Sequence, residues 1–248
     1  MNDNTYNLTK SDENRLSTLL PEKVYFVTGI DTDCGKTVAT ASLSARLLSE
    51  GSNCITQKLI QTGCEGVSDD ILTHRKIEQR PLTEEDESRL TCPLIYTYPC
   101  SPHMAVALDG KELDLSTAGR ATETLLTKYE KVLIEGAGGL MVPLTEEYLT
   151  VDYIADRQLP VILVTTAKLG SINHTLLSLE VLTKRGITLS ALVYNKGIST
   201  DEKITAETER YLRAFLSRHH PETHFIPLER KDIPLQSTLT EQYRPHLI

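Results

Sequence analysis

The fold is decided by one stretch of the sequence, Val24-Tyr25-Phe26-Val27-Thr28-Gly29 followed by Ile30-Asp31-Thr32-Asp33-Cys34-Gly35-Lys36-Thr37. Its first part is short, apolar and rich in β-branched residues, which is typical of a buried strand. From Lys36 to Glu50 apolar residues recur along one helical face, and Gly51 follows at the position of a helix C-cap. The sequence therefore predicts a strand, a glycine-containing turn and a helix.

The turn between this strand and this helix has the residues that a phosphate site requires. Backbone N–H groups at a helix N-terminus bind anions, and Gly35 lets the chain approach them closely. Lys36 can reach terminal phosphates, and the Thr37 hydroxyl can ligate Mg²⁺. The usual spacing places a glycine where Ile30 stands, whereas Gly29 lies one residue earlier, so the loop is a lengthened variant. A helix cap alone would explain an isolated Gly-Lys-Thr, but the flanking strand and helix favour phosphate binding.

The rest of the chain alternates short apolar runs with amphipathic segments. The runs are about Cys54–Leu59, Lys131–Glu135, Pro160–Thr165, Leu189–Asn195 and His224–Leu228. Such strands require a parallel sheet that helices cover on both faces, with its ligand site along the carboxyl edge. We therefore predict an α/β fold, a single P-loop NTPase-like domain over residues 23–248, preceded by a polar N-terminal extension, residues 1–22. The charged stretch 78–90 is expected to form a solvated surface.

A second candidate element begins at Glu135, where an apolar run ends in an acid and continues as Gly136-Ala137-Gly138-Gly139. A carboxylate at the end of a strand suits a Walker-B role near a metal, and the glycines permit close backbone approach to a ligand. A glycine-rich turn after a core strand would explain this stretch equally well by itself. Its pairing with the phosphate loop favours the functional interpretation.

Composition excludes several classes of function. The 248 residues carry a formal charge of -8, which argues against a nucleic-acid partner because such proteins neutralise phosphates with clustered Lys and Arg. No apolar run approaches the length of a membrane span, and no secretory signal is visible. The five cysteines are scattered, which is typical of reduced thiols. We expect a cytoplasmic protein with neither nucleic-acid nor membrane partners.

Five blocks occur in a particular order: Phe26–Thr37, Lys58–Gly63, Ser101–His103, Glu135–Gly139 and Lys168–His174. Together with the lengthened loop they resemble the dethiobiotin synthetase family, the ATP-dependent ligases of biotin synthesis, from about Val24 to Leu228. The resemblance implies a reaction of 7,8-diaminopelargonate, CO2 and ATP that gives a cyclic urea, ADP and phosphate. Carbamate formation, phosphorylation of the carbamate by ATP and ring closure are the implied steps.

The resemblance also implies the catalytic residues and the metal ligands. Lys36 would stabilise the transferring phosphoryl group, and Lys58 would face the carbamate, where a cation steadies developing negative charge. Thr37, Asp69 and Glu135 would hold Mg²⁺ through hard oxygen ligands. Asp70 adjoins Asp69, and an ordinary acid at a helix N-terminus explains Asp69 equally well.

The remaining implied contacts concern the nucleotide, the diamine and a partner subunit. ATP would be bound by Asp33, Cys34, Gly35, Lys36, Thr37, Val38, Asp69, Glu135, Gly136, Ala137 and Gly138, and its purine by Asn195, Pro227, Leu228 and Glu229. The diamine or carbamate would be bound by Thr32, Thr62, Leu169, Gly170 and Asn173. In the family the loop at Leu169 comes from the partner subunit, which implies a homodimer with shared sites.

A regulatory ATPase of the ParA/MinD kind is the main alternative, since it shares the broad fold. Those proteins carry an extra lysine early in the phosphate loop, and Ile30, Asp31 and Thr32 offer none. An amidotransferase-linked ligase would need a further domain, for which 248 residues leave no room. A catalytically inactive nucleotide-binding module is disfavoured because Lys36, Thr37, Lys58 and Glu135 are all present.

Overall fold

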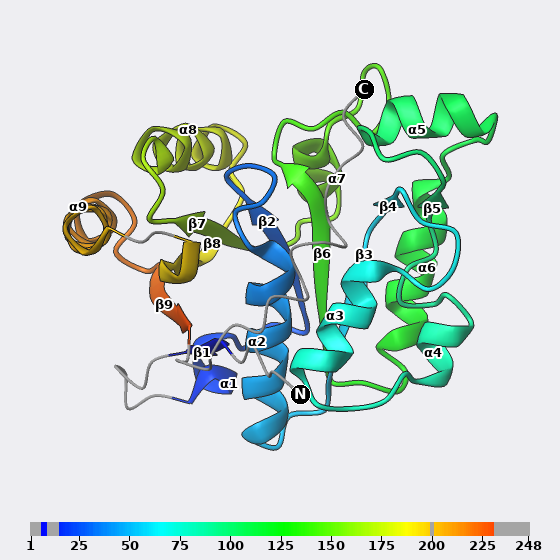
Figure 1. The fold of residues 1–248 in the computed structure, drawn as a ribbon, viewed down its shortest axis with the longest axis horizontal. Helices are drawn as coiled ribbons and strands as arrows, with labels where there is room; N and C mark the ends of the chain where they lie inside the picture. The colour runs from blue at the N-terminus through cyan, green and yellow to red at the C-terminus, as the bar shows by residue number, and fades with distance from the viewer. Residues whose placement is uncertain (1–5, 9–14, 199–200, 231–248) are drawn as a thin grey trace.

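A seven-stranded sheet forms the centre of the computed structural model, which describes residues 6–8, 15–198 and 201–230 (Figure 1). The strand order is β1-β9-β8-β7-β2-β6-β3. All neighbouring strands are parallel except β1, which pairs with β9 in the antiparallel sense. The predicted α/β fold with a parallel sheet is therefore confirmed.

The elements alternate along the chain much as the sequence pattern indicates. The strands are β1 (Tyr6–Leu8), β2 (Val24–Gly29), β3 (Cys54–Lys58), β4 (Gln61–Thr62), β5 (Ile95–Tyr96), β6 (Lys131–Gly139), β7 (Val161–Thr166), β8 (Leu189–Asn195) and β9 (His224–Arg230). The helices are α1 (Leu16–Leu19), α2 (Lys36–Ser49), α3 (Asp69–Ile77), α4 (Glu84–Glu87), α5 (Pro102–Asp109), α6 (Leu115–Leu125), α7 (Thr150–Asp156), α8 (Ser171–Lys184) and α9 (Glu202–His219), with a 3-10 turn at Lys196–Ile198. β4 and β5 form a separate two-stranded sheet.

Helices bury both faces of the main sheet. Because side chains alternate along a strand, Tyr25 and Val27 of β2 enter one core cluster while Phe26 enters the other. The first cluster is completed by α1 and α2, and α3 packs beside α2. The second cluster is completed by residues of α6, α7, α8 and α9. Strands buried on both faces explain the continuous apolar runs in the sequence.

Two parts of the fold differ from the sequence prediction, and the first is the N-terminal segment. Leu16 and Leu20 are completely buried against α2. The carboxylate of Glu50, at the end of α2, accepts hydrogen bonds from the backbone N–H groups of Leu16 and Ser17, which begin α1. Two leucines and one distant acid therefore fix residues 15–20 to the domain, while residues 1–5 and 9–14 of the predicted polar extension lie outside the described residues.

The second difference lies in residues 78–90, which are not simply a solvated surface. Asp86 is 1% exposed, and both of its oxygens accept hydrogen bonds from the guanidinium of Arg75, at 2.8 Å each. Glu85 is also buried, and it accepts hydrogen bonds from Lys128 and Tyr129. Two acids of a largely exposed charged stretch are buried here because partners elsewhere in the sequence supply the opposite charge and the hydrogen bonds.

One further observation concerns membranes. Among the residues that the structure describes, no helix is both long enough and apolar enough to cross a bilayer.

Candidate active site

The phosphate loop lies at the carboxyl end of β2, where α2 begins. Gly35 caps α2 with a φ of 89°, a left-handed conformation that favours glycine, and a Cβ there would collide with the side-chain amide of Asn195. Lys36 is 8% exposed, and its Nζ donates a hydrogen bond to the carbonyl oxygen of Asp31 at 2.8 Å. The ammonium group is thus held across the loop, at the place where a bound phosphate would meet it.

A buried ion-pair cluster stands beside this loop. The register of the parallel strands pairs Lys58, the last residue of β3, with Glu135 of β6. Lys58 Nζ lies 3.0 Å from Glu135 Oε1, 3.0 Å from the carbonyl oxygen of Gly136 and 2.5 Å from Asp70 Oδ2. All three ammonium hydrogens therefore have an acceptor, although Lys58 is only 4% exposed. A lysine at the end of a strand is usually solvated, whereas Lys58 lies at the centre of the candidate site.

The charges of this cluster stabilise each other. Burial alone would lower the pKa of Lys58, but attraction to Glu135 and Asp70 and the hydrogen bonds to them outweigh it and raise that pKa. Burial alone would raise the pKa of Glu135, but the charge of Lys58 and the hydrogen bond from His74 outweigh it and lower that pKa. Both groups are therefore charged at neutral pH.

Of the two neighbouring aspartates, Asp70 and not the predicted Asp69 lies against the phosphate-loop residue Thr37. Asp69 is exposed at the first position of α3, whereas Asp70 turns toward the phosphate loop. Thr37 Oγ1 lies 3.0 Å from Asp70 Oδ1 and 2.9 Å from Glu135 Oε1. The N-cap at Ser68 explains the difference, because it fixes the start of α3 and so determines which of the two residues faces α2.

Thr37, Asp70 and Glu135 form an oxygen cluster with too few hydrogens. A hydroxyl has one hydrogen, so Thr37 can donate to only one of the two carboxylates at a time. The other close oxygen–oxygen contact lies beside the ammonium of Lys58, which contacts both carboxylates. Such hard oxygens suit Mg²⁺, which commonly takes one or two carboxylates and completes its shell with water and phosphate. The donor set therefore fits this ion, although the described residues contain no group of three His, Cys, Asp or Glu placed to hold a metal.

His74 belongs to the cluster and was missed by the sequence analysis. Its ring is completely buried on α3, and Nε2 lies 2.7 Å from Glu135 Oε2. A signal was available, because His74 follows Asp70 by four residues and such positions share one helix face. Because the sequence analysis assigned Asp69 and not Asp70, the four-residue spacing between Asp70 and His74 was not recognised.

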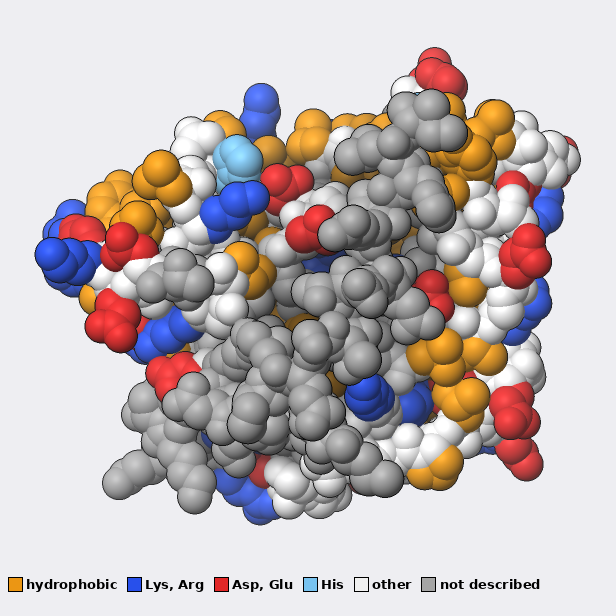
Figure 2. Space-filling view, in the orientation of Figure 1, with side chains coloured by type: hydrophobic (Ala, Val, Ile, Leu, Met, Phe, Trp, Pro, Cys, Tyr) orange, Lys and Arg blue, Asp and Glu red, His pale blue; other side chains and the backbone are white. Residues whose placement is uncertain are grey.

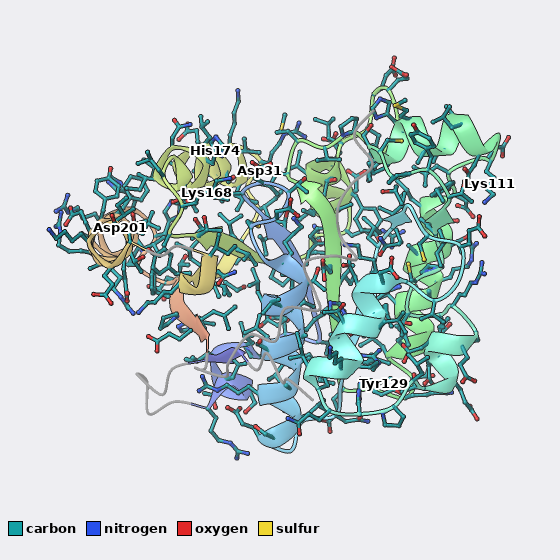
Figure 3. All side chains as sticks on the ribbon, in the orientation of Figure 1. Asp31, Lys111, Tyr129, Lys168, His174 and Asp201 are labelled. Carbon is teal, nitrogen blue, oxygen red and sulfur yellow. The ribbon has the colours of Figure 1, made fainter. Side chains whose placement is uncertain are left out.

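A cavity of about 410 Å³ opens next to the phosphate loop. Thr32, Asp33 and Cys34 line it on one side, and Leu169 and Gly170 line it on the other. Figure 3 shows Asp31 of the loop facing Lys168 and His174, which come from the segment that begins α8. Two segments of this one chain thus line one cavity, whereas the resemblance implies that the loop at Leu169 reaches the site from the partner subunit.

The residues predicted for the purine lie together on adjacent strands, but they are already engaged. Asn195 is 1% exposed; its Nδ2 donates to the carbonyl oxygen of Cys34 at 3.2 Å, and its Oδ1 accepts from the N–H of Gly197 at 3.0 Å. Leu228 pairs with Asn195 in the sheet, and its side chain is in the core. Glu229 accepts a hydrogen bond from Lys196. In this state the amide nitrogen of Asn195 braces the phosphate loop, and both ends of the amide already have a partner.

The other predicted residues are spread around this edge. Val38 follows on the first turn of α2, Gly136, Ala137 and Gly138 extend β6 beyond the predicted strand end, and Pro227 is buried in β9. Thr62 lies on β4, in the smaller sheet, and Asn173 is exposed on α8 outside the residues that line the cavity.

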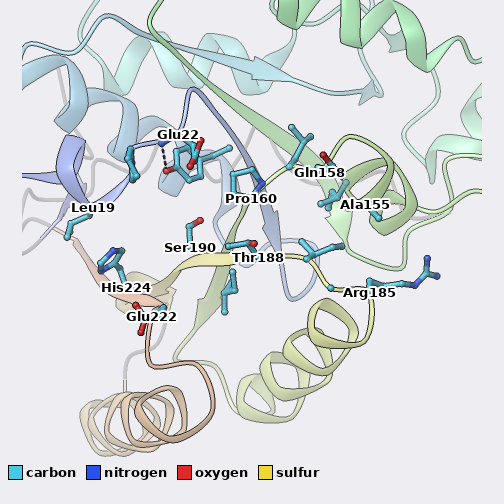
Figure 4. Close-up of a pocket in the computed structure, with 17 residues that line it drawn as sticks. Leu19, Glu22, Ala155, Gln158, Pro160, Arg185, Thr188, Ser190, Glu222 and His224 are labelled. Carbon is cyan, nitrogen blue, oxygen red and sulfur yellow. Dashed lines mark hydrogen bonds between the residues drawn. The ribbon is translucent and has the colours of Figure 1, made fainter.

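A larger cavity, of about 710 Å³, lies at the opposite edge of the sheet (Figure 4). Leu19, Gln158 and Ser190 are among its lining residues, and none of the predicted site residues lines it. The described residues place no buried ion pair there, so its size does not make it the candidate active site.

The comparisons with known proteins agree with the geometry at the carboxyl edge. The protein-family profile described as "AAA domain" matches residues 23–224. The ATP-dependent dethiobiotin synthetase BioD 2 of Pasteurella multocida is 51% identical over 203 residues, which are 82% of this chain and 95% of that protein. The ATP-dependent dethiobiotin synthetase BioD of Chlorobaculum tepidum is 47% identical over 79% of this chain and 82% of its own length.

A solved structure adds evidence on the fold alone. A plasmid partition protein of Borrelia burgdorferi, bound to AMPPNP, superposes with a TM-score of 0.50 over 89% of this chain and 94% of that one, at 15% identity. The sequence relatives, in contrast, are similar enough to establish kinship. By these relatives, the chain is a member of the ATP-dependent dethiobiotin synthetase family and an enzyme of the ligase kind.

Proposed function

We propose that the enzyme converts 7,8-diaminopelargonate, CO2 and ATP into dethiobiotin, ADP and phosphate. One amine nitrogen attacks CO2 and loses a proton, which gives a carbamate. A carbamate oxygen then attacks the γ-phosphorus, and ADP leaves. The second amine attacks the carbonyl carbon and expels phosphate, which closes the urea ring.

Each step assigns work to residues at the carboxyl edge. Lys36 stabilises negative charge on the transferring phosphoryl group. Lys58 faces the carbamate oxygen that attacks this phosphoryl group. Mg²⁺, held by Thr37, Asp70 and Glu135, would neutralise phosphate charge. Thr32, Thr62, Leu169, Gly170 and Asn173 remain the proposed contacts of the diamine. The purine would displace the hydrogen bonds of Asn195, next to Pro227, Leu228 and Glu229.

The observation that carries this proposal is the position of Lys58. A lysine that is 4% exposed, between two carboxylates and beside a phosphate loop, is charged and held in place before any substrate arrives. Preorganised charge of this kind stabilises a transition state without reorganisation during the reaction. Among the described residues, the other buried strand-end lysine, Lys131 at the start of β6, instead donates to backbone carbonyl oxygens.

The test is an assay with Mg²⁺, ATP, ¹⁸O- and ¹⁴C-labelled bicarbonate and the diamine. We expect an acid-stable labelled urea, and one ¹⁸O in the released phosphate, because the carbamate oxygen leaves with it. Lys36→Ala serves as the control and should lose both products while keeping the fold, measured by circular dichroism. ATP hydrolysis without labelled urea would contradict the proposal and favour a regulatory ATPase.

We also propose that the active form is a homodimer. Large hydrophobic side chains are exposed near the site, among them Leu169 (84% exposed) on the cavity rim and Leu177 (59%) on α8. Others lie around α5, where Figure 2 shows hydrophobic side chains gathered on the surface. Light scattering should give twice the mass of 27.7 kDa. Leu177→Glu should shift this toward the monomer, and a monomeric wild type would contradict the proposal.

A further inference from the structure

The strongest unassigned feature is the completely buried imidazole of His74, which links two strands of the sheet. Nδ1 lies 2.9 Å from Thr56 Oγ1 on β3, and Nε2 lies 2.7 Å from Glu135 Oε2 on β6. A buried ring with both nitrogens engaged has one hydrogen pattern that satisfies all its partners, and the neighbouring residues show which one it is.

Arg75 determines this pattern. Its Nη1 lies 2.8 Å from the same hydroxyl of Thr56, and a guanidinium can only donate. The Thr56 oxygen therefore accepts from Arg75, and His74 Nδ1 is the acceptor that the described residues offer to its own hydrogen. The hydrogen of the imidazole then stands on Nε2, where it is donated to Glu135. The guanidinium is itself fixed by two hydrogen bonds to Asp86.

This arrangement gives the two oxygens of Glu135 separate tasks. Oε2 accepts from His74, whereas Oε1 faces Thr37 and Lys58, where phosphate chemistry is proposed. We infer that His74 is a positioning residue: Thr56 and Arg75 hold it as the Nε2–H tautomer, and it fixes the carboxylate of Glu135 so that Oε1 points at the site. The inference rests on the proposed function, because it assigns a role in that same site.

If His74 only filled space in the core, its ring nitrogens would not need to be polar. A leucine could fill much of the space of the ring, but it would leave Glu135 Oε2 and the Thr56 hydroxyl without partners. Groups that hold a metal-ligating carboxylate in place typically contribute tenfold to 100-fold, about 1.4 to 2.7 kcal/mol, to metal affinity or activity. The expected loss is therefore in the use of the ion, while binding of the nucleotide to the phosphate loop should be spared.

The first experiment observes the tautomer directly. The ¹⁵N chemical shifts of the His74 ring in the wild-type protein, correlated with its carbon-bound hydrogens, should show hydrogen on Nε2 and none on Nδ1. Thr56→Val should disturb this pattern, whereas Thr122→Val, which removes another buried threonine hydroxyl bonded to Gln57, should not. Any other pattern in the wild type would overturn the inference, and this result does not require any variant to fold.

The second experiment separates ion use from nucleotide binding. ATP affinity is measured by calorimetry in EDTA and over a range of Mg²⁺ concentrations. His74→Leu should raise the Mg²⁺ concentration needed for half-maximal effect by about tenfold to 100-fold, with affinity in EDTA within about twofold of the wild type. Thr122→Val should match the wild type in both. If His74→Leu also matches it, the inference is wrong; if the wild type binds ATP but forms no urea, the proposed function fails instead.

Discussion

Two buried ion-pair clusters involve α3, one through Asp70 and the other through Arg75, and they differ in design. In the first, Lys58 lies between Asp70 and Glu135. In the second, Arg75 lies between Glu78 and Asp86. The second cluster has a further cation, because Arg80 also contacts Glu78, and both clusters are largely removed from water. Their difference shows why buried charge alone does not identify an active site.

The Arg75 cluster is closed. The guanidinium makes two parallel hydrogen bonds to Asp86 and one each to Glu78 and Thr56, and Thr91 adds a further donor to Asp86. Because the planar guanidinium of Arg75 engages both oxygens of Asp86, this carboxylate has no acceptor free for a ligand. Its contribution is to hold α3 and the segment after it on the sheet and, through Thr56, to fix the hydrogen bonding of His74.

The Lys58 cluster is open on one side. Lysine carries a compact point charge, and its carboxylate partners also contact the hydroxyl of Thr37, which begins α2 behind the phosphate loop. The cluster therefore meets the place where phosphate would bind, whereas the Arg75 cluster does not. Proximity to an anion-binding loop, together with an oxygen set that suits Mg²⁺, distinguishes the Lys58 cluster from the Arg75 cluster.

The largest expected effect comes from removing the cation of the open cluster. Lys58→Met should lower kcat by about 10³-fold, because one preorganised charge at the transition state is lost. ATP affinity should change little, since the phosphate loop and Lys36 are intact. Calorimetry and the labelled-urea assay measure the two quantities. A rate within threefold of the wild type would remove Lys58 from the reaction.

The matching change in the closed cluster should affect stability. Arg75→Met leaves Asp86 and Glu78 buried without their main partner, which should lower the free energy of unfolding by about 3 kcal/mol. Urea denaturation measures this. The kcat of the folded fraction should fall less than that of Lys58→Met, and the opposite order would reverse the roles given to the two clusters.

The assignment of Asp70 in place of Asp69 gives a matched pair of variants on α3. Asp70→Asn should lower kcat/KM at limiting Mg²⁺ by about tenfold to 100-fold, because it weakens an oxygen ligand. Asp69→Asn, an exposed change of the same chemistry, should leave kcat/KM within about twofold. The assay is run over a series of Mg²⁺ concentrations, and equal effects of the two variants would mean that α3 presents a different face to the ion.

The smallest expected effect is the pH dependence of the closed cluster. Burial raises the pKa of Asp86, but hydrogen bonds from Arg75 and Thr83 outweigh it, so the folded pKa lies below the ordinary value. The resulting stabilisation is fully present above about pH 4 and is lost as the pH falls through the folded pKa. The stability gap between the wild type and Arg75→Met should therefore narrow below about pH 4. Urea denaturation at a series of pH values tests this, and a constant gap would contradict it.

Local patterns predicted most of the fold. The apolar runs and the Gly35-Lys36 turn sufficed for the parallel sheet, because each is a property of a few consecutive residues. The segment before residue 23 could not be placed, since Leu16 and Leu20 depend on a surface of α2 that the local pattern does not reveal. The burial of Glu85 and Asp86 depends likewise on distant cations.

For the site, the sequence and the family resemblance identified residues but not their hydrogen bonds. Lys36, Thr37, Lys58 and Glu135 do meet at one edge of the sheet. The choice between Asp69 and Asp70 depends on how α3 is rotated about its axis. Two adjacent aspartates in the sequence do not determine this rotation. His74 was missed because a histidine on a helix gives no sign of its partners until the strands are placed.

The most direct test of the account is a crystal structure with Mg²⁺ and a non-hydrolysable ATP analogue. We predict the γ-phosphate within hydrogen-bonding distance of Lys36 Nζ, and the ion bound to Thr37, Asp70 and Glu135. The account would be contradicted by a nucleotide bound in the larger cavity at the opposite edge of the sheet. It would be contradicted equally by an ion that leaves Glu135 without contact.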